Sequence, residues 1–136
     1  MATWDDVRRL AMAMPEATEK MSRDKAQWRV KDKLFVWERP LRQSDLNALG
    51  DSAPDGPILG ARVEHEMAKE ALIADDPKVF FTTPHFDGYP AILVQLDNIA
   101  VEALEEVVVE AWLCRAPPKL AKAYIDSHGG GAGGDT

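Results

Sequence analysis

The sequence has almost no cysteine, since Cys114 is the only one among 136 residues. A single thiol excludes an intramolecular disulfide and a metal cluster built on several cysteines, and we expect it to be buried as a small apolar side chain. Histidine is also scarce, and His65, His85 and His128 do not have the spacing of a three-histidine zinc site. The sequence therefore predicts no metal site.

Long apolar runs are missing too. The uncharged apolar stretches, such as residues 91–94 and 107–109, are far shorter than the roughly 20 residues that cross a membrane as a helix. Asp5 and Asp6 follow closely behind Met1, and no basic segment leads into an apolar run as it would in a secretory signal. We therefore expect a cytoplasmic protein with no membrane partner.

Basic residues are fewer than acidic ones, and the formal net charge is −7. Such a charge repels polyanions at long range. The charges are unevenly distributed along the chain. Residues 20–42 hold eight basic and three acidic residues, a net charge of +5. Residues 43–110 hold three basic and fourteen acidic residues, a net charge of −11. The sequence predicts an electrically polarised molecule. The eight early cations are Lys20, Arg23, Lys25, Arg29, Lys31, Lys33, Arg39 and Arg42.

The overall amino-acid composition is typical of one folded domain. Apolar residues make up 46% and charged residues 29%, which is ordinary for a globular protein, and the length suits a single core. Residues 1–127 are expected to form this domain. Residues 128–136 are rich in glycine and contain no core-forming side chain, so we expect a disordered tail.

Hydrophobic spacing predicts the elements of that domain. Thr3 followed by Asp6 resembles a capping box, Val7 and Leu10 lie on one face of the helix that follows, and Pro15 ends it. Further helices are expected at residues 66–74, at 101–116 and around 120–125. The predicted strands are residues 26–30, 34–38, 58–64, 79–82 and 91–96, the first two forming a hairpin.

The order of these elements predicts an α+β fold. About five strands, joined mostly by hairpins or long connections, favour an antiparallel sheet over a doubly wound parallel one, and the N-terminal and C-terminal helices are expected to pack on it as a two-layer sandwich. Residues 91–96 are apolar on both faces, as in a central strand. Residues 40–57 contain three prolines and are expected to form a long loop with one helical turn near 45–49.

The basic hairpin is the first candidate site. Arg29 and Lys31 alternate with apolar residues, so their side chains are expected to face solvent. The predicted nucleic-acid-binding set is completed by Lys33, Arg39 and Arg42, which would contact phosphates, and by Trp37, which would stack on a base if exposed. The alternative is a solvated strand face with internal ion pairs, in which Trp37 belongs to the core together with Trp28 and Phe35.

The loop of residues 82–90 is the second candidate site. Two prolines and a glycine restrict its backbone, and it would present Thr82, His85, Asp87 and Tyr89 to a ligand, with Asp87 orienting the imidazole of His85. Lys69 and Glu70 on the preceding predicted helix are in a position to approach it. The alternative is a rigid turn in which Phe86 and Tyr89 fill the edge of the core and His85 bonds to the backbone.

No pattern in the sequence indicates catalysis. The only thiol lies on a helix with a core-facing side, no nucleophile and base share a motif, and the many carboxylates fall on predicted helix surfaces. We therefore expect no catalytic residue, no cofactor and no enzymatic activity.

Three separated segments resemble the signature of the YjbR/MmcQ-like family of small bacterial proteins. They are Lys33-Leu34-Phe35, the run Phe80-Phe81-Thr82-Thr83-Pro84-His85-Phe86-Asp87-Gly88-Tyr89-Pro90 after Asp76-Pro77, and Ala111-Trp112 with Ala116-Pro117. The resemblance extends over about residues 3–126. It implies a two-layer α+β fold similar to that of frataxin-like proteins and the family's label of DNA-binding protein, with no established activity, cofactor or catalytic residue.

Two functions follow from these observations. The first is weak DNA binding through the hairpin of residues 27–39, with an affinity that falls steeply with salt. The second is binding of a protein partner, a small ligand or another copy of the chain through the loop of residues 82–90, without DNA affinity even at low salt.

Overall fold

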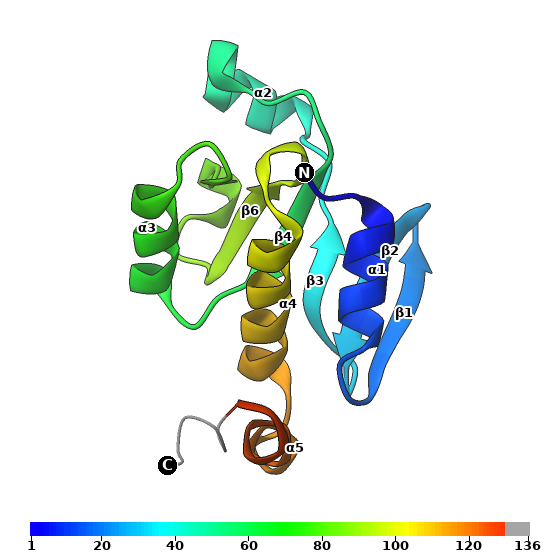
Figure 1. Ribbon diagram of the computed structural model, residues 1–136. Coiled ribbons are helices and arrows are strands. Elements are labelled where there is room, and N and C mark those ends of the chain that lie inside the picture. The colour runs from blue at the N-terminus through cyan, green and yellow to red at the C-terminus, as the bar shows by residue number, and fades with distance from the viewer. Residues whose placement is uncertain (130–136) are drawn as a thin grey trace.

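A six-stranded antiparallel sheet is the frame of the protein (Figure 1). The strands lie in the order β1-β2-β3-β4-β6-β5, and every neighbouring pair is antiparallel. This computed structural model describes residues 1–129. The strands are β1 Ala17–Ser22, β2 Lys25–Val30, β3 Lys33–Glu38, β4 Ile58–Arg62, β5 Phe80–Phe81 and β6 Ala91–Gln95.

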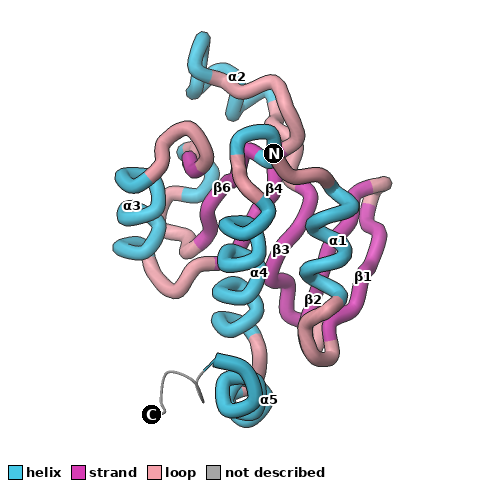
Figure 2. Tube along the Cα trace, in the orientation of Figure 1, coloured by secondary structure: helices cyan, strands magenta, loops and turns pink. Residues whose placement is uncertain are grey.

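Two helices, one from each end of the chain, cover one face of the sheet (Figure 2). The five helices of the described chain are α1 Trp4–Met12, α2 Gln43–Leu49, α3 Glu66–Asp75, α4 Val101–Arg115 and α5 Pro118–Tyr124. α4 packs on β3 and β4, and α1 packs on α4 and β1. The α+β prediction with antiparallel strands and packed terminal helices is confirmed.

The main core lies between this helical layer and the sheet. Trp28, Phe35 and Leu59 from the strands meet Leu104 and Trp112 from α4, and all five side chains are buried. The α4 residues recur at helical spacing, and the strand residues come from the inward side of the pleat. β6 is buried on both faces, as the sequence predicts for a central strand.

The predicted start of α1 is confirmed in atomic detail. The Thr3 hydroxyl accepts a hydrogen bond from the Asp6 amide at 3.3 Å, and the Asp6 carboxylate accepts one from the Thr3 amide at 2.9 Å. This reciprocal pair satisfies two backbone donors that the first turn of a helix would otherwise leave free.

β1 is the strand that the sequence analysis did not expect. It pairs with β2 through all six of its residues, yet it lies at the edge of the sheet and its side chains are mostly exposed. It therefore needs no apolar alternation. The chain reverses at Arg23-Asp24 between β1 and β2, and at Lys31-Asp32 between β2 and β3, with positive φ at all four residues, as in the type I′ turns of two-residue hairpins.

The C-terminal part of the chain lies only partly within the described residues. After α5, a short π-helical turn covers Ile125–Gly129. The rest of the predicted tail at residues 128–136 lies outside the described residues.

The face of the sheet opposite α1 and α4 carries a second, smaller apolar cluster. It contains Trp37, Ile58, Phe86, Ala91 and Leu93. Phe86 comes from the loop of residues 82–90, so this loop covers one part of the second face. The remainder of that face, over β1, β2 and the first half of β3, has no helix packed on it.

Candidate functional site

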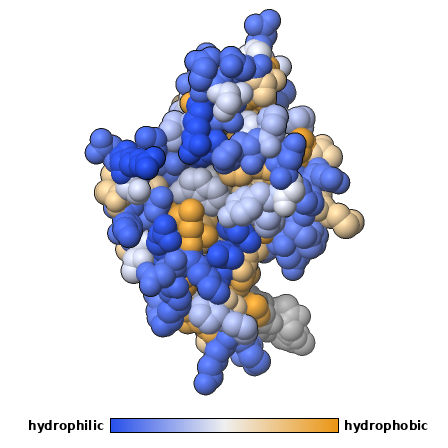
Figure 3. Space-filling model, turned by 180° about the vertical axis from the view of Figure 1, so that it is seen from behind, coloured by the Kyte–Doolittle hydropathy of each residue, from blue (hydrophilic) through white to orange (hydrophobic). Residues whose placement is uncertain are grey.

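A groove of about 850 Å³ lies on this second face. Its one wall is the β1–β2 ribbon, with Ser22, Arg23, Lys25 and Gln27. Its floor holds Leu34 and Trp37, and its other wall combines the segment after β3, from Glu38 to Arg42, with His85, Phe86 and Tyr89. Figure 3 views the molecule from this side and shows a mostly hydrophilic surface around a small apolar area.

The groove is positively charged although the molecule is negative. Four arginine or lysine residues and His85 line it, against one carboxylate, Glu38. One oxygen of that carboxylate already has a hydrogen-bond partner, because Oε1 accepts a hydrogen bond from the Ala26 amide at 2.8 Å. The lining cations are Arg23, Lys25, Arg39 and Arg42.

Strand register brings further cations onto the same face. In the β1–β2 pairing Lys20 lies opposite Gln27, Ser22 opposite Lys25 and Thr18 opposite Arg29. Directly opposed residues of an antiparallel pair point to the same side of the sheet. Lys20, Lys25 and Arg29 therefore share the helix-free face, while the alternate residues of β2 are buried under the helices.

Most of the early cations have no carboxylate partner. Among the ion pairs of residues 1–129, only two involve the eight basic residues of positions 20–42: Lys31 pairs with Glu16, and Arg39 pairs with Asp45. The Arg29 guanidinium instead donates to Gln27 Oε1 and to the Asp32 carbonyl. The positive charge of the ribbon is thus not neutralised by internal acidic groups.

The structure separates the predicted nucleic-acid-binding residues into two groups. Arg42 lines the groove and Arg29 lies on the same face. Lys31 lies in the turn between β2 and β3, and Lys33 is opposite the core residue Val30, so neither lines the groove.

Arg39 and Trp37 differ from what the hairpin hypothesis needs, because both are buried, at 6% and 9% exposure. The indole of Trp37 covers Gly60 so closely that a Cβ at Gly60 would lie 2.4 Å from the ring. Trp37 is therefore part of the floor, with too little exposed ring to stack on a base.

Arg39 belongs to a buried ion pair that fixes the wall of the groove. Its Nη2 lies 3.1 Å from Asp45 Oδ2, and its guanidinium lies 5.2 Å from the centre of the Phe86 ring. The Arg42 amide donates to the same Asp45 oxygen at 2.8 Å. Burial alone would raise the pKa of the Asp45 carboxyl, but the Arg42 amide and the Arg39 charge outweigh it and lower the pKa below 3.8.

The loop of residues 82–90 is held from behind by Lys69. Lys69 of α3 is 3% exposed, and its Nζ donates to the Phe86 carbonyl at 2.8 Å and pairs with Glu66 at 2.8 Å. The approach of Lys69 to the loop, which the sequence analysis considered, is confirmed. Lys69 thus anchors the turn that carries His85 into the groove.

The four predicted loop residues have different surroundings. His85 is exposed and its ring meets the edge of Phe86, while Tyr89 is 43% exposed and accepts a hydrogen bond from Arg62 at 2.9 Å. Thr82 is half-buried and Asp87 exposed. No hydrogen bond between Asp87 and His85 occurs within residues 1–129, so Asp87 does not orient the imidazole in this structure.

Comparison with known proteins identifies the relatives of this chain. The YjbR family model matches residues 12–114. The chain belongs to the YjbR family. Two YjbR-like relatives are the uncharacterized proteins Rv2570 of Mycobacterium tuberculosis and Mb2600 of Mycobacterium bovis, each 53% identical over 132 residues that cover 95% of this chain and all of the relative.

A solved structure supports the fold of this YjbR-family chain. The crystal structure of the Deinococcus radiodurans protein DR2400, described by the domain DUF419, matches with a TM-score of 0.62. The match covers 95% of this chain and 82% of that one at 20% sequence identity. At this identity the likeness concerns the fold alone.

Other expectations from the sequence concern groups outside the groove. Cys114 is half-buried, and burial raises the pKa of its thiol. Within residues 1–129 no three or more histidine, cysteine, aspartate or glutamate residues are grouped so that they would hold a metal ion. No helix of the described chain is long and apolar enough to cross a membrane.

The sequence analysis missed Lys20, Arg23 and Lys25 as site residues. It counted them in the basic segment, but without β1 there was no strand register to place them. A usable signal was present, because Ser22-Arg23-Asp24-Lys25 lies between two stretches that can each extend, and Asp is common in type I′ turns.

Proposed function

We propose that this YjbR-family protein binds single-stranded nucleic acid in the groove on the open face of its sheet, without catalysing a reaction. The observation that carries the proposal is the charge of the lining: Arg23, Lys25 and Arg42 have no carboxylate partner within residues 1–129, and Glu38 is the one carboxylate that lines the groove, on a molecule of net charge −7. Phosphates would contact the cations that have no carboxylate partner, above all Lys25 and Arg42 from opposite walls.

The apolar part of the groove favours a single strand over a duplex. Leu34 and the exposed Tyr89 line the same groove as the cations, and only unpaired bases expose faces and edges that reach such a surface. A duplex would present its phosphates but keep its bases stacked. The proposed complex therefore combines phosphate contacts on the ribbon with base contacts on the wall formed by the loop of residues 82–90.

A smaller anionic ligand is the second candidate, and it would use the same groove. The volume of about 850 Å³ lies in the range of small-molecule sites, and His85 and Tyr89 line it. The loop site predicted from the sequence and the basic hairpin would then be two walls of one site for a phosphate-bearing compound such as a nucleotide.

The first test titrates a labelled twelve-nucleotide single strand and its duplex with the protein at about 50 mM and 200 mM salt. Four phosphate contacts to a single strand would change the affinity about fifty-fold over this range. We expect the single strand to bind more tightly than the duplex. Comparable affinity for both would contradict the single-strand proposal, and no binding at 50 mM would contradict nucleic-acid binding altogether.

A matched pair of variants locates the contact. The groove variant Lys25→Ala with Arg42→Ala removes one unpaired cation from each wall, and we expect it to weaken single-strand binding about tenfold and to flatten the salt dependence. The control Lys78→Ala with Lys119→Ala removes the same charge from exposed positions outside the groove and should bind as the wild type does. Equal losses in both variants would show a contact that depends on net charge alone.

Competition distinguishes the two candidates. Adenosine monophosphate or inorganic phosphate that displaces the strand at micromolar concentration would favour the small-ligand site. Displacement only at millimolar concentration would favour the strand, whose affinity depends on several phosphates together.

A further inference from the structure

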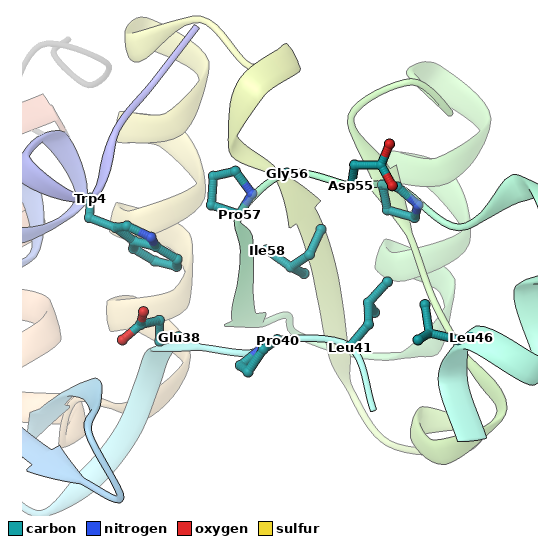
Figure 4. A pocket seen from close by; sticks show the side chains of 10 residues that line it. Trp4, Glu38, Pro40, Leu41, Leu46, Asp55, Gly56, Pro57 and Ile58 are labelled. Carbon is teal, nitrogen blue, oxygen red and sulfur yellow. The ribbon is translucent and has the colours of Figure 1, made fainter. Parts of the chain in front are cut away.

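A second pocket, adjacent to the groove, has the opposite charge. It is about 300 Å³ in volume and lies between the start of α1, the segment that follows β3, and the loop that leads into β4 (Figure 4). Glu38 and Asp55 line it, and no lysine, arginine or histidine does. We propose that this pocket binds a small organic cation, namely an alkylammonium group with a short apolar substituent.

One end of the pocket combines an aromatic ring with a carboxylate. Figure 4 shows Trp4 and Glu38 at the same end, on different segments of the chain. An ammonium group is attracted both by the face of an indole and by a carboxylate. A neutral hydroxyl gains only an uncharged hydrogen bond from this pair, and an anion is repelled by the carboxylate.

The Glu38 carboxylate is held in position for such a contact. Its Oε1 accepts a hydrogen bond from the Ala26 amide at 2.8 Å, and the side chain is half-buried. An amide-anchored carboxylate keeps one direction, which reduces the conformational entropy that a ligand would otherwise have to remove. The second oxygen has no hydrogen-bond partner among the described residues.

The other end of the pocket is apolar. Leu41, Leu46 and Ile58 line it, and Figure 4 shows Leu41 and Leu46 on the side away from Trp4. Asp55 lies near this end, but its carboxylate turns outward in the figure. An alkyl chain of a few carbons would fit between these side chains, and the small volume excludes large ligands.

Prolines and close packing restrict the backbone of the pocket walls. Three prolines, Pro40, Pro54 and Pro57, line the pocket, and proline fixes the backbone. Gly56 packs against Asp97 so closely that a Cβ there would lie 2.2 Å from the carboxylate oxygen. The Pro57 carbonyl accepts a hydrogen bond from the Leu96 amide at 3.2 Å.

Nuclear magnetic resonance of the indole groups tests this proposal. The protein has four tryptophans, so ¹⁵N-labelled protein gives four indole signals, and the signal lost in Trp4→Phe belongs to Trp4. We expect n-butylammonium chloride to shift this signal saturably, with n-butanol binding at least about fivefold more weakly and sodium chloride of equal ionic strength causing no saturable shift. Equal binding of butanol would overturn the proposal.

Two variants separate charge recognition from a general effect. Glu38→Gln keeps an oxygen that can accept from the Ala26 amide but removes the charge, and we expect it to weaken butylammonium about fivefold or more and leave butanol unchanged. Asp51→Asn removes an exposed carboxylate that does not line the pocket and should have no effect. Unchanged butylammonium binding in Glu38→Gln would overturn the proposal, and if that variant fails to fold, the comparison of butylammonium with butanol in the wild type decides.

The pocket and the groove share Glu38, Pro40 and Leu41, but the test of this site does not depend on the proposed nucleic-acid function. The titration uses no nucleic acid, and the groove variant Lys25→Ala with Arg42→Ala does not alter any residue that lines this pocket. A positive butylammonium result with no nucleic-acid binding, or the reverse, therefore judges the two proposals separately.

Discussion

One buried ion pair, between Arg39 and Asp45, holds the wall of the groove in place on the open face of the sheet. Arg39 and Asp45 have side chains that are 7% and 2% exposed, and together they join the segment after β3 to α2 and to Phe86. A buried pair contributes little net stability compared with two well-packed apolar residues, but removing one partner leaves an uncompensated charge. The wall of the groove is therefore sensitive to either residue.

Asp45→Asn should destabilise the folded protein. The amide can still accept from the Arg42 amide, but the Arg39 guanidinium is left without a counter-charge in a buried place, so we expect the free energy of unfolding to fall by about 3 kcal/mol. Urea denaturation measures this loss. Asp51→Asn, at an exposed position, should change stability by less than about 0.5 kcal/mol, and Arg39→Met combined with Asp45→Asn should recover part of the loss.

The lowered pKa of Asp45 gives this contribution a pH dependence. Above pH 3.8, the ordinary value, the carboxyl is ionised in the folded and unfolded chains, and the pair contributes fully. Below it the unfolded chain takes up a proton before the folded chain does, so the contribution falls until the pH passes the folded pKa. The stability difference between wild type and Asp45→Asn should therefore shrink below pH 3.8, and a difference that stays constant would contradict the assignment.

How well individual residues can be predicted depends on whether their environment is local. The Thr3–Asp6 capping box needs only three residues of spacing, and it was predicted correctly. The burial of Trp37 depends on the bulge that shifts the β2–β3 register near Trp28 and Arg29 and on Gly60 of another strand. The partner of Arg39 likewise comes from α2. The alternative interpretation, in which Trp37 belongs to the core, is confirmed, but the alternation of one strand could not decide between the two interpretations, and it does not contain the partner of Arg39.

At the scale of elements, the two tight turns of the ribbon are the least favourable part of the backbone. Lys31 and Asp32 have φ values of +50° and +66°, a region that side chains with a Cβ enter at some cost and that glycine enters freely. The β2–β3 hairpin forms despite this because its strands bury Trp28 and Val36 against the helices.

Replacing one turn residue should therefore stabilise the protein. Asp32→Gly relieves the positive φ at an exposed position, and we expect a gain of about 0.5–1 kcal/mol in the free energy of unfolding. Asp32→Ala is the matched control, since it removes the same carboxylate but tolerates the left-handed region less well than aspartate. It should lower the thermal midpoint, whereas Asp32→Gly should raise it; a common direction would contradict a backbone origin.

The helices and strands that the sequence predicts correctly are those whose buried side chains recur with the spacing of a helix or a strand. α4 has its stripe of core residues at helical spacing, β6 is apolar on both faces, and the hairpin strands carry aromatic and β-branched residues. β1 has none of these features, because an edge strand whose side chains are mostly exposed needs little more than its hydrogen bonds to β2. Because β1 was not predicted, the cations of the β1–β2 ribbon could not be placed in the basic wall of the groove.

At the scale of the whole molecule, the two candidate sites turn out to be neighbours. The basic hairpin and the loop of residues 82–90 are separated by more than forty positions in the sequence, yet they line one groove because the loop folds across the second face of the sheet, where Phe86 lies in one apolar cluster with Trp37 of β3. The charge balance along the chain indicated a polarised molecule, but only the order of the strands shows that the cations face away from α4. Sequence reasoning could thus find the loop and part of the basic wall, but not the site between them.

Charge separation should be visible in chromatography. At pH 7 a protein of net charge −7 would pass through a sulfonate column if its charge were evenly spread. We expect weak retention there at low salt through the ribbon, in addition to retention on a quaternary ammonium column through the acidic residues of α4. Lys25→Ala with Arg42→Ala should lose the first retention and keep the second, while Lys78→Ala with Lys119→Ala should keep both.

The uneven distribution of charge between the two faces of the molecule would also determine its orientation on an anionic film. With the unpaired cations of β1 and β2 on the helix-free face and the glutamates of α4 in the helical layer on the other, we expect the ribbon to turn toward the film, so that the protein adsorbs with its helical layer outward. A layer of this protein would therefore be oriented by its own dipole moment, without any covalent attachment.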